Sequence, residues 1–233
     1  MRMFADWKFP ARWLAGGLWF ACLLAAAPAH ELSTQKPLQF TPPHPGSYTL
    51  QKIMRAPDGT VLGLDYKPHK LSRYITGKVT LLSFVYTACT DPNGCPLAYQ
   101  AFSELKQEIQ KKPGMREKVR FVSLSFDPQH DTPQAMRLYG GSHVIGRDGF
   151  QWYFLTTRSP KQLLPLLDGF GQDVSVVTDP ENGKPSPVLS HVLKVFLIDK
   201  EGDIREIYTT SFLLPQIVLN DIQTLLLEDG EFN

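Results

Sequence analysis

The pattern of apolar and polar residues along this chain predicts strands that alternate with helices. Residues 79–86 form a nearly continuous apolar run, which is typical of a strand buried on both faces of a sheet. Residues 97–112 instead carry apolar side chains at close to helical spacing. Further strands are expected at residues 59–66, 119–126, 152–155, 192–199 and 204–208, and further helices at 133–139, 160–170 and 215–227.

Two pairs of a hydroxyl residue and a proline mark the starts of helices. Thr132 precedes Pro133 and Ser159 precedes Pro160, so both hydroxyl side chains are expected to cap the helices that follow. The proline-rich stretch Pro185–Pro187 is expected to be a loop before the strand at 192–199. The alternation of strands and helices predicts a layered α/β fold.

The N-terminus has the pattern of an export signal. Arg2, Lys8 and Arg12 provide positive charge around the start of an apolar run at residues 13–27. A small-x-small pattern directly after this run predicts cleavage before His30. An uncleaved membrane anchor is the alternative, although the run is shorter than the roughly twenty residues that a spanning helix needs.

These features predict three segments. Residues 1–29 are expected to be the signal peptide or anchor, residues 30–48 an extended, proline-rich tether, and residues 49–233 the folded domain. We therefore expect an exported, periplasmic protein whose association with a membrane depends on the N-terminal segment. The net charge of +1 and the lack of a long basic run give no indication of nucleic-acid binding.

Removal of the signal would leave a single pair of cysteines. The chain has 3 cysteines, and Cys22 lies within the predicted signal. Cys89 and Cys95 would then act together in an oxidising compartment, as a disulfide, a dithiol or a pair of metal ligands. They lie between the strand at 79–86 and the helix at 97–112, where the positive end of the helix favours a thiolate.

The spacing of the two cysteines requires a loop between them. Residues six apart on a continuous helix would point about 240° away from each other, so the two thiols could not meet. Pro92, Asn93 and Gly94 are turn formers and make a loop plausible at this point. Pro96 suits the first helical position, which predicts Cys95 as the N-cap and Cys89 on a loop that folds back toward it.

Three other residues are candidates for the same site. His191 is expected at the start of the strand at 192–199, and a histidine at such a position is by itself more often a surface residue. Asp127 and Asp131 follow the strand at 119–126, at the end where open α/β sheets gather functional residues. Asp131 also has an ordinary explanation, because it precedes a helix start.

The order of these elements is that of a thioredoxin-like fold, and the motifs resemble the SCO/SenC family of thioredoxin-like copper proteins. The resemblance covers roughly residues 45–228. It rests on Phe84-Val85-Tyr86-Thr87-Ala88-Cys89, Cys95-Pro96, Ser125-Phe126-Asp127-Pro128, Asp131-Thr132-Pro133, Trp152-Tyr153-Phe154-Leu155-Thr156, Ser190-His191 and Phe196-Leu197-Ile198-Asp199 with Gly202. It implies a central mixed sheet flanked by helices, with an N-terminal β extension.

The resemblance also implies a copper site. By position, Cys89, Cys95 and His191 match the family's copper ligands, and Asp127 and Asp131 match an acidic segment near that site. The implied function is delivery of Cu(I) or Cu(II) to a respiratory oxidase subunit or another cuproprotein. One departure is clear: the family usually has three residues between its cysteines, and this chain has five.

Other functions remain open at this point. Some members of the family act as thiol-disulfide reductases, so an oxidoreductase that uses Cys89 and Cys95 to reduce a partner's cysteines is the main alternative. A peroxide-reducing enzyme is disfavoured, because the Thr87-Ala88-Cys89 segment lacks the proline of a peroxidatic turn. A static structural disulfide between Cys89 and Cys95, with no chemical role, is the remaining alternative.

Overall fold

The computed structural model describes residues 40–144, 149–178 and 183–230. Contacts divide the chain into residues 1–36 and 37–233, and every described residue belongs to the second unit. The predicted signal peptide at residues 1–29 and its cleavage site lie outside the described residues. Among the helices described, none is both long enough and apolar enough to cross a membrane.

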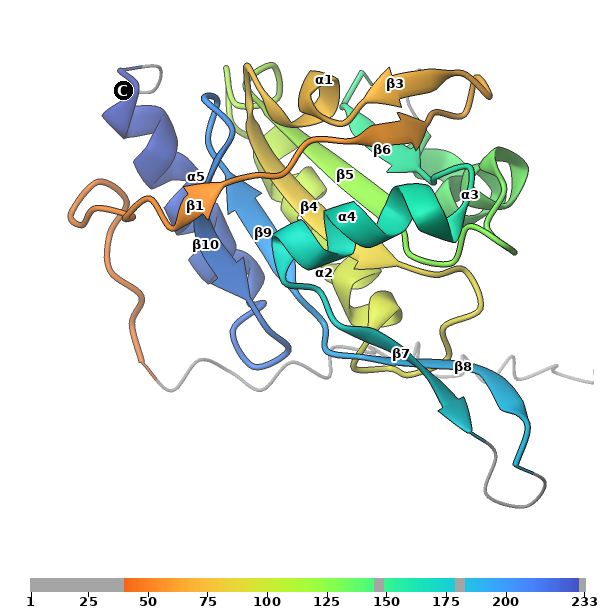
Figure 1. Ribbon diagram of the computed structural model, residues 1–233. Coiled ribbons are helices and arrows are strands. Elements are labelled where there is room, and N and C mark those ends of the chain that lie inside the picture. Colours follow the sequence, from red (N-terminus) through yellow and green to blue (C-terminus); the bar gives the residue numbers. More distant parts are fainter. Residues whose placement is uncertain (1–39, 145–148, 179–182, 231–233) are drawn as a thin grey trace, which may run out of the picture. The chain divides into compact units, whose positions relative to one another are not determined.

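A six-stranded mixed sheet forms the centre of the domain (Figure 1). Its central strand β4 runs parallel to β5 and antiparallel to β9, which confirms the expected mixed sheet. All 7 residues of β4 are buried, as its continuous apolar sequence predicted. In spatial order the strands are β1 (Met54–Arg55), β10 (Asp203–Tyr208), β9 (Val195–Ile198), β4 (Val79–Val85), β5 (Val119–Ser125) and β6 (Trp152–Leu155).

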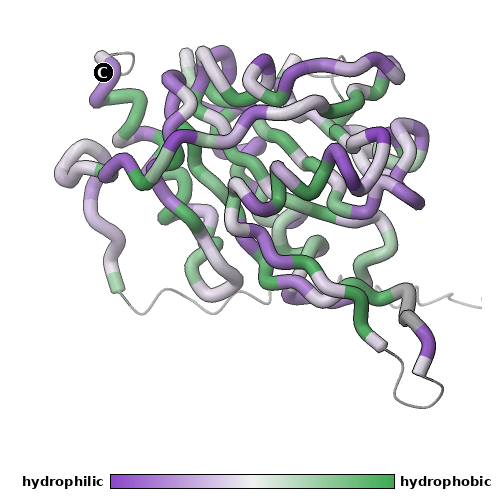
Figure 2. Tube along the Cα trace, viewed as in Figure 1, coloured by the Kyte–Doolittle hydropathy of each residue, from purple (hydrophilic) through white to green (hydrophobic). Residues whose placement is uncertain are grey.

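Helices cover both faces of this sheet, so the fold is the expected thioredoxin-like α/β arrangement. Helix α4 lies in front of the sheet, and α2 and α5 pack together behind it (Figure 1). Figure 2 shows that hydrophobic residues concentrate in the central strands between these layers. The helices are α1 (Ser72–Ile75), α2 (Cys95–Gln110), α3 (Pro133–Gly140), α4 (Pro160–Phe170) and α5 (Pro215–Glu228), with a 3-10 turn at Gly141–His143.

Aromatic side chains form the core on each side of the sheet. Phe84 of β4 contacts Phe170 of α4, with ring centroids 5.4 Å apart. On the other side, Phe102 of α2 lies 4.8 Å from Phe121 of β5 and 5.6 Å from Trp152 of β6. These large buried rings fix both helices on the sheet from which the cysteine loop leaves.

Two small hairpins accompany the main sheet. The first, β2 (Thr60–Leu62) with β3 (Pro68–Lys70), provides the N-terminal β extension together with β1. The second, β7 (Val174–Thr178) with β8 (Pro185–His191), protrudes from the domain (Figure 1). The predicted loop at Pro185–Pro187 was therefore wrong, because a two-stranded ribbon has free edges where proline is tolerated. The strand predicted from residue 192 begins only at Val195.

The two predicted helix caps differ. Thr132 Oγ1 accepts a hydrogen bond from the Ala135 amide at 3.2 Å, which confirms the cap of α3. Ser159 precedes α4 as expected, but its side chain makes no capping bond. Its backbone carbonyl oxygen accepts from the Gln162 amide at 3.0 Å instead.

The residues before the main sheet are held against α5. The Gly46 amide donates to Thr224 Oγ1 at 3.0 Å, and the Tyr48 hydroxyl donates to Asp221 Oδ1 at 2.5 Å. Burial and this carboxylate raise the pKa of Tyr48 to about 12. The last residues of the predicted tether, where the structure describes them, are thus anchored to the domain.

A buried ion pair ties the end of the sheet to α5. Arg205 of β10 contacts Asp199 at 3.1 Å, and the two side chains are only 6% and 2% exposed. The same guanidinium donates to the Leu50 carbonyl oxygen and contacts Glu228 at 2.9 Å. A buried charge without its partner is costly, so this network depends on all of its members.

We expect Arg205→Met to lower the free energy of unfolding by about 3–5 kcal/mol, because it leaves the buried Asp199 carboxylate unpaired. Arg55→Met is the matched control, since Arg55 is 63% exposed where it contacts Asp203. Loss of an exposed pair should cost about 0–1 kcal/mol. Urea denaturation of both variants measures the difference, and equal losses would contradict the assigned role of the buried pair.

Candidate metal centre

The loop between the cysteines consists of two consecutive turns. The Cys89 amide donates to the Tyr86 carbonyl oxygen at 3.2 Å, directly after β4 ends. The Gly94 amide then donates to the Asp91 carbonyl oxygen at 3.0 Å, and Asp91 Oδ1 accepts from the Asn93 amide at 2.9 Å. The chain reverses twice within a few residues, as the turn formers in this loop predicted, and this brings Cys89 back toward the start of α2.

Gly94 allows the close approach of Cys89 without any shift of its neighbours. A Cβ atom at residue 94 would lie 3.3 Å from Cys89 Sγ and 3.4 Å from the Asp91 carbonyl oxygen. Only glycine therefore leaves room for the sulfur without displacement of its neighbours. Helix α2 begins at Cys95 with Gly94 as its N-cap, one residue earlier than predicted.

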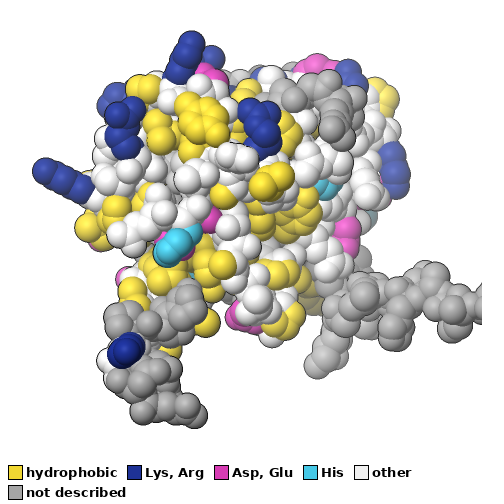
Figure 3. All heavy atoms as spheres, turned by 90° about the vertical axis from the view of Figure 1, so that its right-hand side faces the viewer, with side chains coloured by type: hydrophobic (Ala, Val, Ile, Leu, Met, Phe, Trp, Pro, Cys, Tyr) yellow, Lys and Arg dark blue, Asp and Glu magenta, His cyan; other side chains and the backbone are white. Residues whose placement is uncertain are grey.

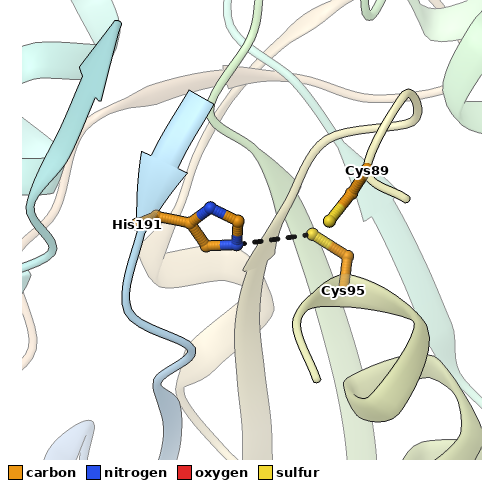
Figure 4. Close-up of side chains that lie close together, drawn as sticks. All are labelled: Cys89, Cys95 and His191. Carbon is orange, nitrogen blue, oxygen red and sulfur yellow. Dashed lines mark hydrogen bonds between the residues drawn. The ribbon is translucent and has the colours of Figure 1, made fainter. Parts of the chain in front are cut away.

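The hairpin β7–β8 supplies a third side chain. His191 is the last residue of β8, not the first residue of the following strand, and it pairs with Val174 of β7. Its ring points toward the cysteines, with Nε2 3.8 Å from Cys95 Sγ (Figure 4). One ligand atom from each of Cys89, Cys95 and His191 lies within 4.8 Å of the others. The structure thus brings together all three predicted ligand candidates.

The orientation of His191 is fixed by its neighbours. Its Nδ1 lies 3.1 Å from the Leu189 carbonyl oxygen, which can only accept a hydrogen bond, so Nδ1 carries the ring hydrogen. In the neutral ring Nε2 therefore carries the lone pair, and this is the nitrogen that faces Cys95. The rings of Tyr86 and Phe126 enclose the imidazole at centroid distances of 5.7 and 4.8 Å.

The two sulfurs lie in different environments. Cys95 is only 1% exposed and Cys89 is half-buried, and both are free thiols. Burial raises the pKa of the Cys95 thiol, and negative charge on Cys89 raises it further. The expectation that the helix start would favour a thiolate at this position is therefore wrong for Cys95, because desolvation outweighs the backbone amides.

The carboxylate of Asp131 binds the start of the cysteine loop through hydrogen bonds. Its carboxylate is 1% exposed and accepts hydrogen bonds from Thr87 Oγ1 at 2.5 Å and Ser125 Oγ at 2.6 Å. It also accepts from the Thr87 amide at 3.1 Å. Asp131 thereby joins Thr87, which follows β4, to Ser125 at the end of β5. Thr87 lies two residues before Cys89 in the sequence.

Asp127 lies at the edge of this arrangement. Its carboxylate contacts Nδ1 of the exposed His130 at 2.8 Å. No hydrogen bond between described side chains links Asp127 to Cys89 or His191. Of the two predicted acidic residues, only Asp131 acts directly on the loop that carries a cysteine.

Two cavities flank the three ligand candidates. One, of about 310 Å³, lies between the cysteine loop and the hairpin, beside Tyr86 and His191. The other, of about 390 Å³, lies beside both cysteines and is lined by Tyr99 and Tyr139.

The face shown in Figure 3 carries hydrophobic patches and dispersed Lys and Arg side chains rather than one charged surface.

The aromatic residues of the site were not predicted from the sequence. Tyr86 and Phe126 flank the ends of adjacent strands that pair in parallel, and this position was the available signal for them. Tyr99 lies one helical turn after Cys95, so its position on the same face of α2 was also predictable. Tyr139 comes from α3 and gave no such signal.

Comparison with known proteins assigns the chain to a family. The family model for SCO1/SenC matches residues 70–227. The chain belongs to the SCO1/SenC family. This membership confirms the resemblance found in the sequence motifs, despite the wider spacing of the cysteines.

Three individual relatives are 22–26% identical to this SCO1/SenC chain. A candidate copper-binding protein from Stutzerimonas stutzeri is 26% identical over 155 residues, which cover 63% of this chain and 69% of the relative. The copper-bound structure of ScoI from Bradyrhizobium japonicum is 22% identical with a TM-score of 0.58, covering 74% of this chain and 99% of that one. Apo Sco1 from Thermus thermophilus is 23% identical with a TM-score of 0.60, covering 78% and 96%. These two structures share the fold.

We expect Asp131→Ala to lower the free energy of unfolding by about 1–3 kcal/mol for each buried donor that it leaves without an acceptor. The buried Ser125 hydroxyl is such a donor, and the partly buried Thr87 hydroxyl and amide add smaller losses. Asp127→Ala is the control, since it removes a contact with an exposed histidine and should cost about 0–1 kcal/mol. The prediction fails if urea denaturation gives the two variants the same stability.

Proposed function

We propose that this protein binds one copper ion through Cys89, Cys95 and His191 and delivers it to another protein. The observation that carries the proposal is the convergence of two sulfurs and one imidazole nitrogen within 4.8 Å, from a loop, a helix and a separate hairpin. Membership in the SCO1/SenC family and the copper-bound ScoI relative support the choice of metal.

The donor set suits copper on chemical grounds. Thiolates are soft ligands that favour Cu(I), and an imidazole is suitable for either Cu(I) or Cu(II). His191 meets the requirements for a ligand before any metal enters, because the Leu189 carbonyl oxygen fixes its ring and leaves Nε2 facing Cys95. Binding would release the Cys95 proton, which makes the affinity depend on pH.

The exposure of the site favours transfer over permanent storage. Cys89 lies on a half-buried loop, and His191 at the base of the protruding hairpin is itself only partly buried, so a ligand from another protein could reach the metal. We propose a respiratory oxidase subunit or a related cuproprotein as the acceptor. The export signal expected at residues 1–29 supports a periplasmic location, with any membrane association through that segment.

A second candidate function uses the same cysteines without metal. Cys89 and Cys95 are free thiols close to each other, one accessible and one buried. This asymmetry suits a thiol-disulfide oxidoreductase that reduces the cysteines of a partner protein. His191 separates the two functions, because a dithiol reductase does not need an imidazole ligand.

The test is anaerobic Cu(I) binding by the reduced protein, in competition with a chromophoric Cu(I) chelator. Wild type should bind one copper per chain, and Cys89→Ser and Cys95→Ser should each lose tight binding. His191→Ala should weaken binding but leave thiol-disulfide exchange largely intact. His130→Ala is the matched control, because His130 is exposed and contacts only Asp127 among the described acidic residues.

Two results would contradict the copper proposal. One is the absence of tight Cu(I) binding in wild type, combined with a readily reducible Cys89–Cys95 disulfide, which would favour the oxidoreductase. The other is equal copper affinity in His191→Ala and His130→Ala, which would exclude His191 as a ligand.

A further inference from the structure

The hairpin that carries His191 is tied together at its base by one buried side chain. Helix α4 leads directly into β7 (Figure 1), and Gln172 lies between them and is only 4% exposed. Its Nε2 donates to the Asp173 carbonyl oxygen at 3.2 Å and to the Val192 carbonyl oxygen at 3.0 Å. Asp173 directly precedes β7 and Val192 directly follows β8, so one amide group joins the two strands where they leave the domain.

The orientation of the Gln172 amide follows from its partners. Both partners are carbonyl oxygens, which only accept hydrogen bonds, so the nitrogen of the amide must face them. Each of its two hydrogens then has one acceptor. An apolar side chain of similar length would fill the same space and make neither bond.

Gln172 is itself fixed to the core of the domain. Its backbone amide donates to the Leu167 carbonyl oxygen at 2.9 Å, in the turn that ends α4. In the last turn of this helix the ring of Phe170 lies 5.4 Å from that of Phe84 and 5.0 Å from that of Phe196, measured between centroids. The two hydrogen bonds of Gln172 therefore connect a helix end packed on the central sheet with a ribbon that protrudes from it.

These hydrogen bonds act next to the residue pair that contains His191. His191 pairs with Val174 across the hairpin, and the two carbonyl groups that Gln172 holds belong to the neighbouring residues, Asp173 and Val192. Among the described strands, β7 and β8 pair only with each other. The position of the imidazole relative to the sulfurs thus depends on how the base of the hairpin is held.

We propose that Gln172 is a positioning residue, which holds the base of the hairpin so that the His191 imidazole stays beside the cysteine sulfurs. Loss of its two hydrogen bonds frees both strands to move away together, since their pairing with each other is unaffected. Lys194 Nζ also donates to the Gly171 carbonyl oxygen, which gives the chain after the hairpin a second, more exposed link to the end of α4. The consequence for a bound metal rests on the copper site proposed above, whereas the consequence for the hairpin does not.

The first test measures amide hydrogen exchange in the reduced, metal-free full chain. Gln172→Met keeps a side chain of similar length and removes both donors. Amides of β7 and β8 should exchange about tenfold faster than in wild type, as expected for the loss of two partly buried hydrogen bonds. Amides of β4 should keep the wild-type rate, because the core of the sheet opens independently of the hairpin.

Gln216→Met is the matched control. Gln216 Nε2 donates to Asn220 Oδ1 at 2.8 Å within α5, so the same substitution removes a side-chain donor that does not contact the hairpin. Exchange in the hairpin should stay within about twofold of wild type in this variant. Gln172→Leu, which also lacks a donor, provides the same comparison if thermal melting shows that Gln172→Met is unfolded.

A second measurement follows the imidazole itself, again without metal. Diethyl pyrocarbonate should modify His191 about tenfold faster in Gln172→Met, because the ring reacts once the hairpin has opened. Peptide mass spectrometry identifies the modified residue. The exposed His130 is the internal reference and should react at the same rate in both proteins.

A third measurement uses copper, if wild type binds it. A Cu(I) chelator should remove the metal about tenfold faster from Gln172→Met, because opening of the hairpin removes one ligand before the ion leaves. The equilibrium affinity should change less than about twofold, since Gln172 makes the same hydrogen bonds with and without metal and so favours neither form.

Equal hairpin exchange in wild type and Gln172→Met would overturn the role of Gln172, and so would faster exchange in β4 as well, which indicates a general loss of stability. Faster exchange of the hairpin with an unchanged rate of His191 modification would overturn the positioning of the imidazole. Failure of wild type to bind copper would overturn the metal site and leave the first two measurements as a full test of Gln172.

Discussion

The candidate site depends on one buried carboxylate that holds two strand ends together. Asp131 accepts hydrogen bonds from Thr87, just after β4, and from Ser125, the last residue of β5. These hydrogen bonds to a buried carboxylate determine where the chain leaves the sheet. The cysteine loop, including its first turn, starts from the position that this carboxylate fixes. The long loop is compatible with a compact site because its first residues are not free to move.

The central sheet and its helices were predictable because their signals are local. The continuous apolar run of β4 and the helical spacing of α2 each report burial directly, and the structure places both close to the expected bounds. Thr132 was identified as a cap because its hydroxyl serves a neighbouring amide. Ser159 was not predictable in the same way, since the preference for a capping side chain is statistical and its backbone serves the helix instead.

The rest of the site arises from contacts between distant parts of the chain. His191 was identified by resemblance, but its strand was not, because prolines in Pro185–His191 suggested a loop. Burial reversed the expected effect of the helix start on Cys95, and burial is a tertiary property. Tyr139 lines the cavity beside the cysteines from a helix more than forty residues further along the chain, so no spacing rule could place it there. The sequence motifs identified the candidate ligands, whereas tertiary packing determines their burial and their neighbours.

The hairpin gives the three candidate ligands unequal mechanical support. Cys89 and Cys95 are fixed to the six-stranded sheet, while His191 belongs to a two-stranded sheet that pairs only with itself among the described strands. Val174 at its base is half-buried, and Val176 further out is 57% exposed. Exposed ribbons of this kind open locally at a lower free energy than the core around them. The imidazole would therefore be the first of the three candidate ligands to move away, while both sulfurs stay in place.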